Sequence, residues 1–145
     1  VEAQLPAEQR GILKAVHDKE SILKDKSILL VDDDMRNVFA LSNVLEDKGM
    51  NVTIARDGSE SLEKLKDNPD INLVLMDIMM PKMDGYEAMQ EIRKQKKYAS
   101  LPIIALTAKA MKGDRSKCIE AGASDYLAKP IDTNKLISMM RVWLY

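Results

Sequence analysis

The chain has very little of several features that define large classes of proteins. It contains a single cysteine, Cys118, so no internal disulfide is possible, and a reducing, cytoplasmic setting is expected. Its formal net charge is only −1, which gives no strong electrostatic attraction to nucleic acid. No apolar run approaches the ~20 residues that span a bilayer, and no signal peptide is visible. Binding to nucleic acid and direct membrane contact are therefore not expected.

Histidine is equally scarce. His17 is the only histidine in the sequence, and no companion helices around it suggest the bundle that phosphohistidine chemistry on this chain would need. We therefore interpret His17 as a structural residue. The length of 145 residues is enough for one domain with a full core and one further element.

From residue 27 onward, apolar strand-like runs alternate with segments of helical period, which favours βαβ units around a parallel sheet. Strands are predicted over 27–31, 50–55, 72–77, 102–106 and 125–128, and helices over 36–48, 60–66, 86–96, 112–121 and 133–145. The first, third and fourth strands are unbroken apolar runs, as expected for strands covered on both faces. The second alternates and the fifth is short, which suits sheet edges. The order 2-1-3-4-5 satisfies this with right-handed crossovers, so the expected fold class is α/β with a doubly wound, five-stranded parallel sheet.

The first of these helices shows an apolar spacing typical of a helix that covers a sheet. Its predicted buried face consists of Val38, Phe39, Leu41, Val44 and Leu45.

Residues 1–25 form a separate segment, which we predict to be an N-terminal helical connector before a domain over 26–145. An apolar stripe lies among charged residues in this segment, at Leu5, Ile12, Val16 and Leu23. Because the chain begins at Val1 and stops at Tyr145, we expect it to be a piece of a longer polypeptide that this helix joins to an upstream domain. An ordinary N-terminal helix resting on the domain is the alternative.

Polar side chains stand at the carboxyl ends of four predicted strands. They are Asp32, Asp33 and Asp34 after the first strand, Asp77 at the end of the third, Thr107 after the fourth and Lys129 after the fifth. The carboxyl ends of parallel strands gather at one edge of a sheet, where ligands bind. Acids, a hydroxyl and an ammonium group meeting there suggest that the site handles a phosphoryl group with a divalent cation.

The carboxylates indicate a metal site. Two unit charges about 4 Å apart repel by roughly 4 kcal/mol at an effective dielectric near 20, so the cluster requires a cation or protonation of a member. Oxygen ligands with room for water favour Mg²⁺. We predict that Asp33 and Asp77 are metal ligands, whereas Asp34 is better explained as a cap or surface residue of the following helix.

Asp77 is the predicted nucleophile, because a carboxylate can accept a phosphoryl group to form an acyl phosphate. Thr107 and Lys129 can bind the oxygens of the incoming group and offset its charge. Tyr126 has two interpretations: a half-buried aromatic at a sheet edge, or a side chain that turns inward when Thr107 moves toward a bound phosphate. The sequence leaves both open.

Together these residues resemble the receiver (response-regulator) domain of two-component phosphorelays over about residues 26–145. The motifs are Asp32-Asp33 after the first strand, Asp77 in Leu-Val-Leu-Met-Asp-Ile-Met-Met-Pro-Lys-Met-Asp-Gly, Thr107 in Ala-Leu-Thr-Ala, and Lys129-Pro130. The resemblance implies a flavodoxin-like fold in which Asp77 takes a phosphoryl group from a phosphohistidine. It also implies that Mg²⁺ is held by Asp33, Asp77 and the backbone carbonyl of Met79, with Asp32 assisting. Thr107 and Tyr126 would form the switch pair, and the bond before Pro130 would be cis.

The resemblance also implies the partners, which are a histidine kinase or a histidine phosphotransfer domain. The domain would be a monomer or a weak dimer through the 112–121 helix, the 125–128 strand and the 133–145 helix, which would also form its output surface. As an isolated domain it would not be an enzyme beyond Mg²⁺-dependent self-phosphorylation at Asp77. The leading segment resembles the connector before the C-terminal receiver of a hybrid sensor histidine kinase, a cytoplasmic part of a membrane-anchored chain.

Three alternatives remain. A haloacid-dehalogenase-like phosphohydrolase would use Asp32 as nucleophile and Asp34 two residues on, but Arg36 stands where that motif has Thr or Val, and Asp77 has no role. A flavodoxin-like cofactor binder needs a Ser-, Thr- or Gly-rich loop after the first strand, where this chain is acidic. A degenerate receiver acting only as an interaction module would not need Asp33, Asp77, Thr107 and Lys129 together.

Overall fold

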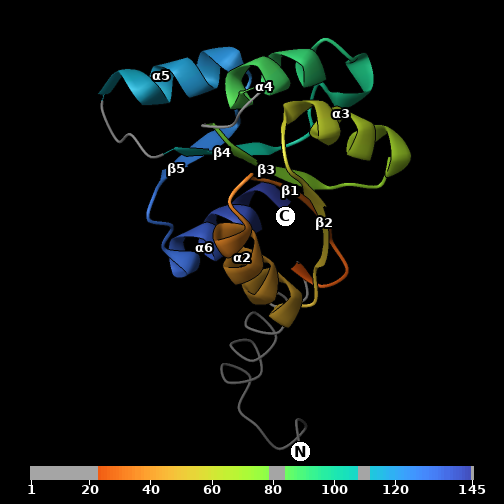
Figure 1. The fold of residues 1–145 in the computed structure, drawn as a ribbon, viewed down its shortest axis with the longest axis vertical. Helices are drawn as coiled ribbons and strands as arrows, with labels where there is room; N and C mark the ends of the chain where they lie inside the picture. Colours follow the sequence, from red (N-terminus) through yellow and green to blue (C-terminus); the bar gives the residue numbers. More distant parts are fainter. Residues whose placement is uncertain (1–22, 79–83, 108–111, 145) are drawn as a thin grey trace, which may run out of the picture.

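A computed structural model describes residues 23–78, 84–107 and 112–144, which form a parallel five-stranded sheet in the order β2-β1-β3-β4-β5 (Figure 1). The strands are β1 (Ser27–Val31), β2 (Asn51–Ala55), β3 (Leu73–Asp77), β4 (Ile103–Thr107) and β5 (Asp125–Ala128). The predicted fold class and strand order are confirmed. The three inner strands are almost wholly buried, whereas β2 and β5 are partly exposed. This difference explains why the inner strands read as unbroken apolar runs.

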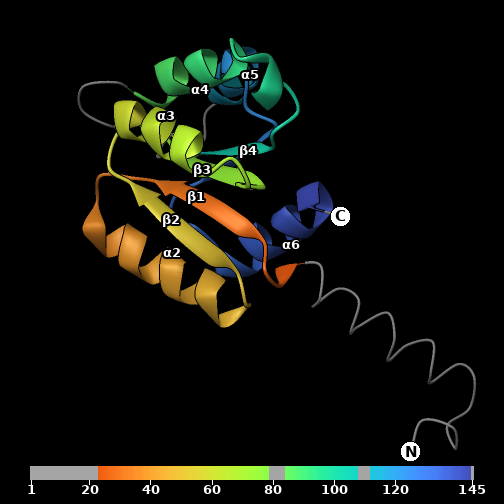
Figure 2. The ribbon, with the colours of Figure 1, turned by 90° about the vertical axis from the view of Figure 1, so that its right-hand side faces the viewer.

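Helices cover both faces of the sheet (Figures 1 and 2). They are α2 (Met35–Asp47), α3 (Gly58–Asp67), α4 (Gly85–Arg93), α5 (Lys112–Ala121) and α6 (Thr133–Leu144), with a short 3₁₀ helix, η2 (Lys96–Tyr98). In both views α3, α4 and α5 lie on one side of the sheet, and α2 and α6 lie on the other. Over the described residues, no helix has the length and apolar character needed to cross a membrane.

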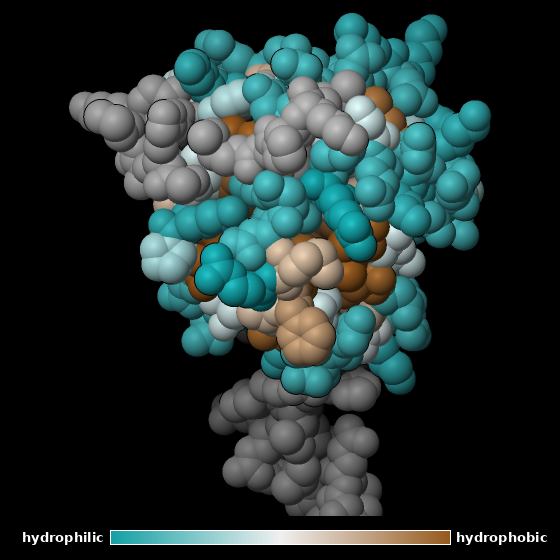
Figure 3. All heavy atoms as spheres, in the orientation of Figure 1, coloured by the Kyte–Doolittle hydropathy of each residue, from teal (hydrophilic) through white to brown (hydrophobic). Residues whose placement is uncertain are grey.

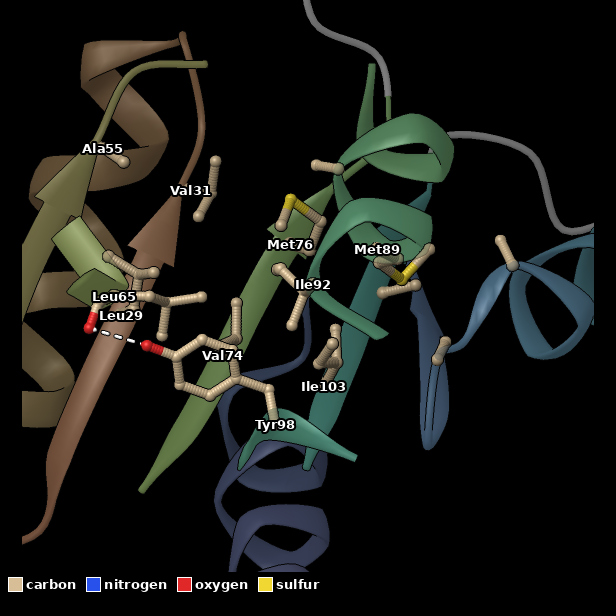
Figure 4. Close-up of a cluster of buried hydrophobic side chains, with 14 of the residues drawn as sticks. Leu29, Val31, Ala55, Leu65, Val74, Met76, Met89, Ile92, Tyr98 and Ile103 are labelled. Carbon is tan, nitrogen blue, oxygen red and sulfur yellow. Dashed lines mark hydrogen bonds between the residues drawn. The ribbon is translucent and has the colours of Figure 1, made fainter. Parts of the chain in front are cut away.

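Each face of the sheet has its own hydrophobic core, because successive strand residues point to opposite sides. Leu29, Val31, Val74 and Met76 belong to the cluster under α3, α4 and α5, whose side chains are drawn in Figure 4. The intervening residues Leu30 and Leu75 belong to the cluster under α2 and α6. Two packed layers on the buried inner strands hold the strand ends in fixed positions.

One prediction for α2 was wrong. Val38, Leu41 and Leu45 are buried as expected, but 69% of the Phe39 surface is exposed. Phe39 lies one residue, or about 100° of helical rotation, from the buried Val38. The buried face of α2 is therefore narrower than the apolar pattern of the sequence predicted.

The helix predicted over 86–96 also ends earlier, at Arg93. The Arg93 guanidinium turns back and donates to the carbonyl oxygens of Tyr98 (2.6 Å) and Gly122 (2.9 Å). Burial lowers the pKa of Arg93. These hydrogen bonds favour a break in the helix, because they connect its end to the segments before β4 and β5.

The predicted connector over 1–25 lies almost entirely outside the described residues, so it stays a prediction. Leu23, at the start of the described chain, is buried in the core under α2 and α6. The first described residue of the chain therefore packs against the core under α2 and α6.

The hydroxyl of Tyr98 provides a test of the other core. It donates to the carbonyl of Leu65 at 3.0 Å in a buried position, as Figure 4 shows. Tyr98→Phe should lower the free energy of unfolding by about 1–2 kcal/mol, because the Leu65 carbonyl loses a buried donor. Urea denaturation measures this loss.

Lys97→Ala is the control. The Lys97 ammonium lies over the Tyr98 ring, 4.9 Å from its centroid, and this variant keeps both the ring and the hydroxyl. A loss of only about 0.5–1 kcal/mol is expected. An unchanged stability in Tyr98→Phe would show that the hydroxyl hydrogen bond contributes nothing.

Candidate functional site

The predicted site residues stand where neighbouring strands end. Val31, the last residue of β1, pairs with Met76 of β3, and Asp32 is the residue after Val31. Asp77, the last residue of β3, pairs with Leu106 of β4. Thr107 closes β4 beside Ala128, the residue before Lys129. The sheet register therefore brings Asp32, Asp77, Thr107 and Lys129 to one edge.

The acids converge into one cluster. Asp32, Asp33 and Asp77 each offer a carboxylate oxygen, and these three oxygens all lie within 4.8 Å of one another. Asp32 and Asp77 are buried, whereas Asp33 is exposed. The cluster is thus open to solvent on the Asp33 side and closed beneath.

Among the residues that the structure describes, Lys129 brings a positive charge to the acidic cluster. Its Nζ lies 3.1 Å from Asp77 Oδ1 and 3.6 Å from Asp32 Oδ2, and only 23% of its side chain is exposed. The Lys129 amide donates to the Thr107 carbonyl at 2.7 Å, which fixes its backbone to the end of β4. The ammonium group therefore partly offsets two buried carboxylates at once.

The two oxygens of Asp32 have different surroundings. Oδ1 accepts from the Asp34 amide at 2.9 Å. Oδ2 is buried and accepts no hydrogen bond from the described part of the chain. A buried carboxylate oxygen that accepts no hydrogen bond and has the Lys129 ammonium only at 3.6 Å, next to two further carboxylates, fits a divalent cation that prefers oxygen ligands.

Asp34 has the capping role that its position predicted. Its side chain accepts from the Arg36 amide at 3.0 Å and caps α2. Hydrogen bonds from the Arg36 side chain, and then from its amide, hold the pKa of Asp34 below its ordinary value. Asp34 is therefore an ionised cap, outside the cluster of three acids.

Thr107 and Tyr126 lie on the same side of the sheet. Thr107 is buried, and Tyr126 pairs with Ala105 and packs against the core under α3, α4 and α5. The half-buried aromatic at an edge strand is thus present, and its role as a switch stays a prediction. The Lys129–Pro130 bond is cis, as expected.

Met79, whose backbone carbonyl was predicted as a metal ligand, lies outside the described residues. Sequence reasoning missed Gly85, the first residue of α4. A Cβ at this position would lie against the Asp77 carbonyl oxygen and 2.8 Å from Ile78 Cα. The Asp84-Gly85 pair signals a capped helix start, but the sequence gives no sign of this close approach.

A groove leads to the site between α2 and the segment after β5. It has a volume of about 250 Å³ and is lined by Asp32, Asn37, Ala40, Leu41, Lys129, Pro130, Ile131 and Thr133. On the outer side of α2, 52% of Met35 and 69% of Phe39 are exposed. Figure 3 shows apolar atoms gathered on the surface in the region of α2.

This fold and this acidic site define a known class of signalling domains. The family described as "Response regulator receiver domain" matches residues 28–141, so the chain belongs to that family. The resemblance of the sequence motifs to receiver domains is confirmed.

Three relatives illustrate the range of proteins that carry this domain. The chain is 40% identical to the transcriptional regulatory protein CpxR of Escherichia coli over 117 residues, 81% of this chain and 48% of that protein. It is 39% identical to the histidine-protein kinase BarA of the same organism over 114 residues, 79% of this chain and 12% of BarA. The chain spans about half the length, or less, of the curated relatives it matches.

The third is a crystal structure, the receiver domain of the sensor histidine kinase PA1611 from Pseudomonas aeruginosa. The two chains are 38% identical, with a TM-score of 0.73, and the match covers 83% of this chain and 98% of that one. That structure has a magnesium ion coordinated in its active-site cleft.

The ion pairs of Lys129 can be tested by stability. In the presence of a chelator, Lys129→Met should lower the free energy of unfolding by about 1–3 kcal/mol, because two buried carboxylates lose their counter-charge. Lys94→Met is the matched control, since Lys94 forms an exposed pair with Glu91 at 2.7 Å. That variant should change stability by less than about 0.5 kcal/mol. Equal effects of the two substitutions in urea denaturation would contradict this account of the site.

Proposed function

We propose that this domain accepts a phosphoryl group from a phosphohistidine onto Asp77 and thereby changes its affinity for a partner. One observation carries the proposal: of the two buried carboxylates in the acidic cluster, Asp77 lies closer to the Lys129 ammonium, at 3.1 Å against 3.6 Å for Asp32. The family assignment favours this function over a haloacid-dehalogenase-like phosphohydrolase that would use Asp32 and Asp34.

The acidic cluster is the proposed site of Mg²⁺. Asp32, Asp33 and Asp77 would hold the cation, together with the predicted carbonyl of Met79. When bound, Mg²⁺ would neutralise the carboxylates and lower the charge repulsion that an incoming phosphoryl group meets. The magnesium in the cleft of the PA1611 receiver supports this proposal.

The side chains of this chain have distinct roles in the transfer. A carboxylate oxygen of Asp77 attacks the phosphorus atom; the new O–P bond forms as the P–N bond breaks, and the released imidazole nitrogen takes up a proton. The Lys129 ammonium can exchange its ion pair with the Asp77 carboxylate for one with an oxygen of the bound phosphoryl group. The Thr107 hydroxyl can donate to another. Because Asp77 is nearly fully buried, the phosphoryl group has to approach through the open Asp33 side.

The switch would connect this site to the β5 edge. Thr107 and Tyr126 lie on the same side of the sheet, on paired strands. A movement of Thr107 toward the phosphoryl group would open space into which the Tyr126 ring can turn. The changed surface along α5, β5 and α6 would then be the one a partner or an upstream kinase senses, and through which a weak dimer would form.

The donor would be a histidine kinase or a histidine phosphotransfer domain, and it must contact the surface around the site. The exposed Met35 and Phe39 lie on α2, the helix that also lines the groove to Asp32 and Lys129. We therefore infer that a helix of the donor packs against this part of α2. The 39% identity to BarA and the kinase origin of the PA1611 receiver support a hybrid sensor kinase as the parent chain, with residues 1–25 as its connector and a cytoplasmic location.

Asp77→Asn tests the phosphorylation site. Incubation of the wild-type domain with acetyl phosphate and Mg²⁺ should add one phosphate to the intact mass, and Asp77→Asn should add none, because the amide is a poor nucleophile. Omitting Mg²⁺ should also prevent the gain. If Asp32→Asn abolished the gain and Asp77→Asn kept it, the phosphohydrolase alternative would be correct instead.

Phe39→Ala tests the docking surface. Transfer from a phosphorylated histidine phosphotransfer domain should slow by about tenfold, because the loss of an exposed aromatic anchor costs 1–2 kcal/mol at an interface. Phosphorylation by acetyl phosphate should not change, because a small donor does not need the surface. Leu62→Ala is the control, because Leu62 is a partly buried apolar residue on α3, away from both α2 and the surface along α5, β5 and α6. Equal transfer rates for Phe39→Ala and wild type would place the donor elsewhere.

A further inference from the structure

The first turn of α4 lies unusually close to the backbone of the proposed phosphoacceptor. At Gly85, an added Cβ would meet the Asp77 carbonyl oxygen, and it would lie 2.8 Å from Ile78 Cα and 2.9 Å from Ile78 Cδ1. Real Cβ atoms essentially never come within 3.0 Å of such neighbours. Gly85 has no positive φ angle, so the requirement for glycine here is space and not backbone conformation.

Hydrogen bonds hold the same backbone from two sides. The Ile78 amide donates to the Leu106 carbonyl of β4 at 3.0 Å, and the Ile78 carbonyl accepts from the Gly85 amide at 3.1 Å. The peptide that follows Asp77 is therefore fixed between a central strand and the start of α4.

The helix itself cannot withdraw at low cost. Ala88, Met89 and Ile92 are fully buried against the sheet, and Asp84 caps the first turn by accepting from the Glu87 amide at 2.9 Å. A side chain at position 85 would therefore have to displace the backbone of Asp77 and Ile78. Repacking α4 instead would disturb the core under α3, α4 and α5, and close-packed protein interiors do not absorb added volume easily.

We propose that Gly85 is a positioning residue for phosphoryl transfer. Because it has no side chain, α4 presses on the Asp77–Ile78 backbone and holds the Asp77 carboxylate toward Asp33 and Lys129. This inference rests on the proposed function, since it assigns Gly85 a role only if Asp77 is the phosphoacceptor.

Gly85→Ala is the direct test, and Gly122→Ala is its control. A Cβ at Gly122 would lie 2.7 Å from Arg93 Cγ, and its φ of +120° also disfavours alanine, but it lies before β5, at the opposite end of the strands. Both variants should lose stability. Per folded molecule, only Gly85→Ala should slow phosphorylation by acetyl phosphate, by about tenfold or more, and weaken Mg²⁺ binding. A wild-type rate and Mg²⁺ affinity in folded Gly85→Ala would overturn the proposal.

A pair of cap variants decides the case if Gly85→Ala does not fold. Asp84→Ala loosens the first turn of α4, whereas Asp57→Ala removes the equivalent cap of α3, where Asp57 accepts from the Glu60 amide at 2.8 Å. Asp84→Ala should slow phosphorylation several-fold more than Asp57→Ala, and equal rates would again overturn the proposal. The wild-type protein in the same assay separates the role of Gly85 from the proposed function of Asp77. If the wild type gains no phosphate, the function of Asp77 is refuted; if only the variants differ from expectation, the role of Gly85 is.

Discussion

The structure depends on one electrostatic constraint, which is that carboxylates of like charge are held together at the edge of a buried sheet. Asp32 and Asp77 are both buried, and Asp33 joins them within 4.8 Å. Such a cluster is unfavourable by itself, since repulsion and desolvation act in the same direction. Lys129 offsets part of this cost, and in the proposed function the remaining negative charge attracts a divalent cation and, through it, a phosphoryl group. The site exists because the fold holds the three carboxylates together despite their repulsion.

The doubly wound sheet provides that tolerance. Two separate cores fix the strands from both faces, so the strand ends cannot move apart to relieve repulsion. The register of β1, β3, β4 and β5 then determines which side chains meet. The same rigidity would let a change at the site reach the β5 edge, as proposed for the switch, because Thr107 and Tyr126 lie on paired strands that pack against one core.

Much of this could be predicted from the sequence, because strands and their polar ends are local patterns. The order 2-1-3-4-5 satisfied the edge character of the second and fifth strands and agreed with the resemblance to receiver domains, and the convergence of Asp33, Asp77 and Lys129 followed from that order. Features set by packing between distant segments could not be predicted. Phe39 fits an apolar helix pattern but lies outside the buried stripe, and the helix end at Arg93 depends on carbonyls of Tyr98 and Gly122. The need for glycine at position 85 arises from a contact with Asp77 that no periodicity reveals.

Isothermal titration calorimetry of charge-neutralising variants measures how far Mg²⁺ binding depends on the clustered carboxylates. Asp34 is the internal control, because it is an acid of the same segment that caps α2 and stands outside the cluster. Asp33→Asn and Asp77→Asn should each weaken Mg²⁺ binding by about tenfold or more, whereas Asp34→Asn should keep the wild-type affinity within about twofold. Equal losses in all three variants, or no measurable Mg²⁺ binding by the wild type, would contradict Mg²⁺ binding at the clustered carboxylates.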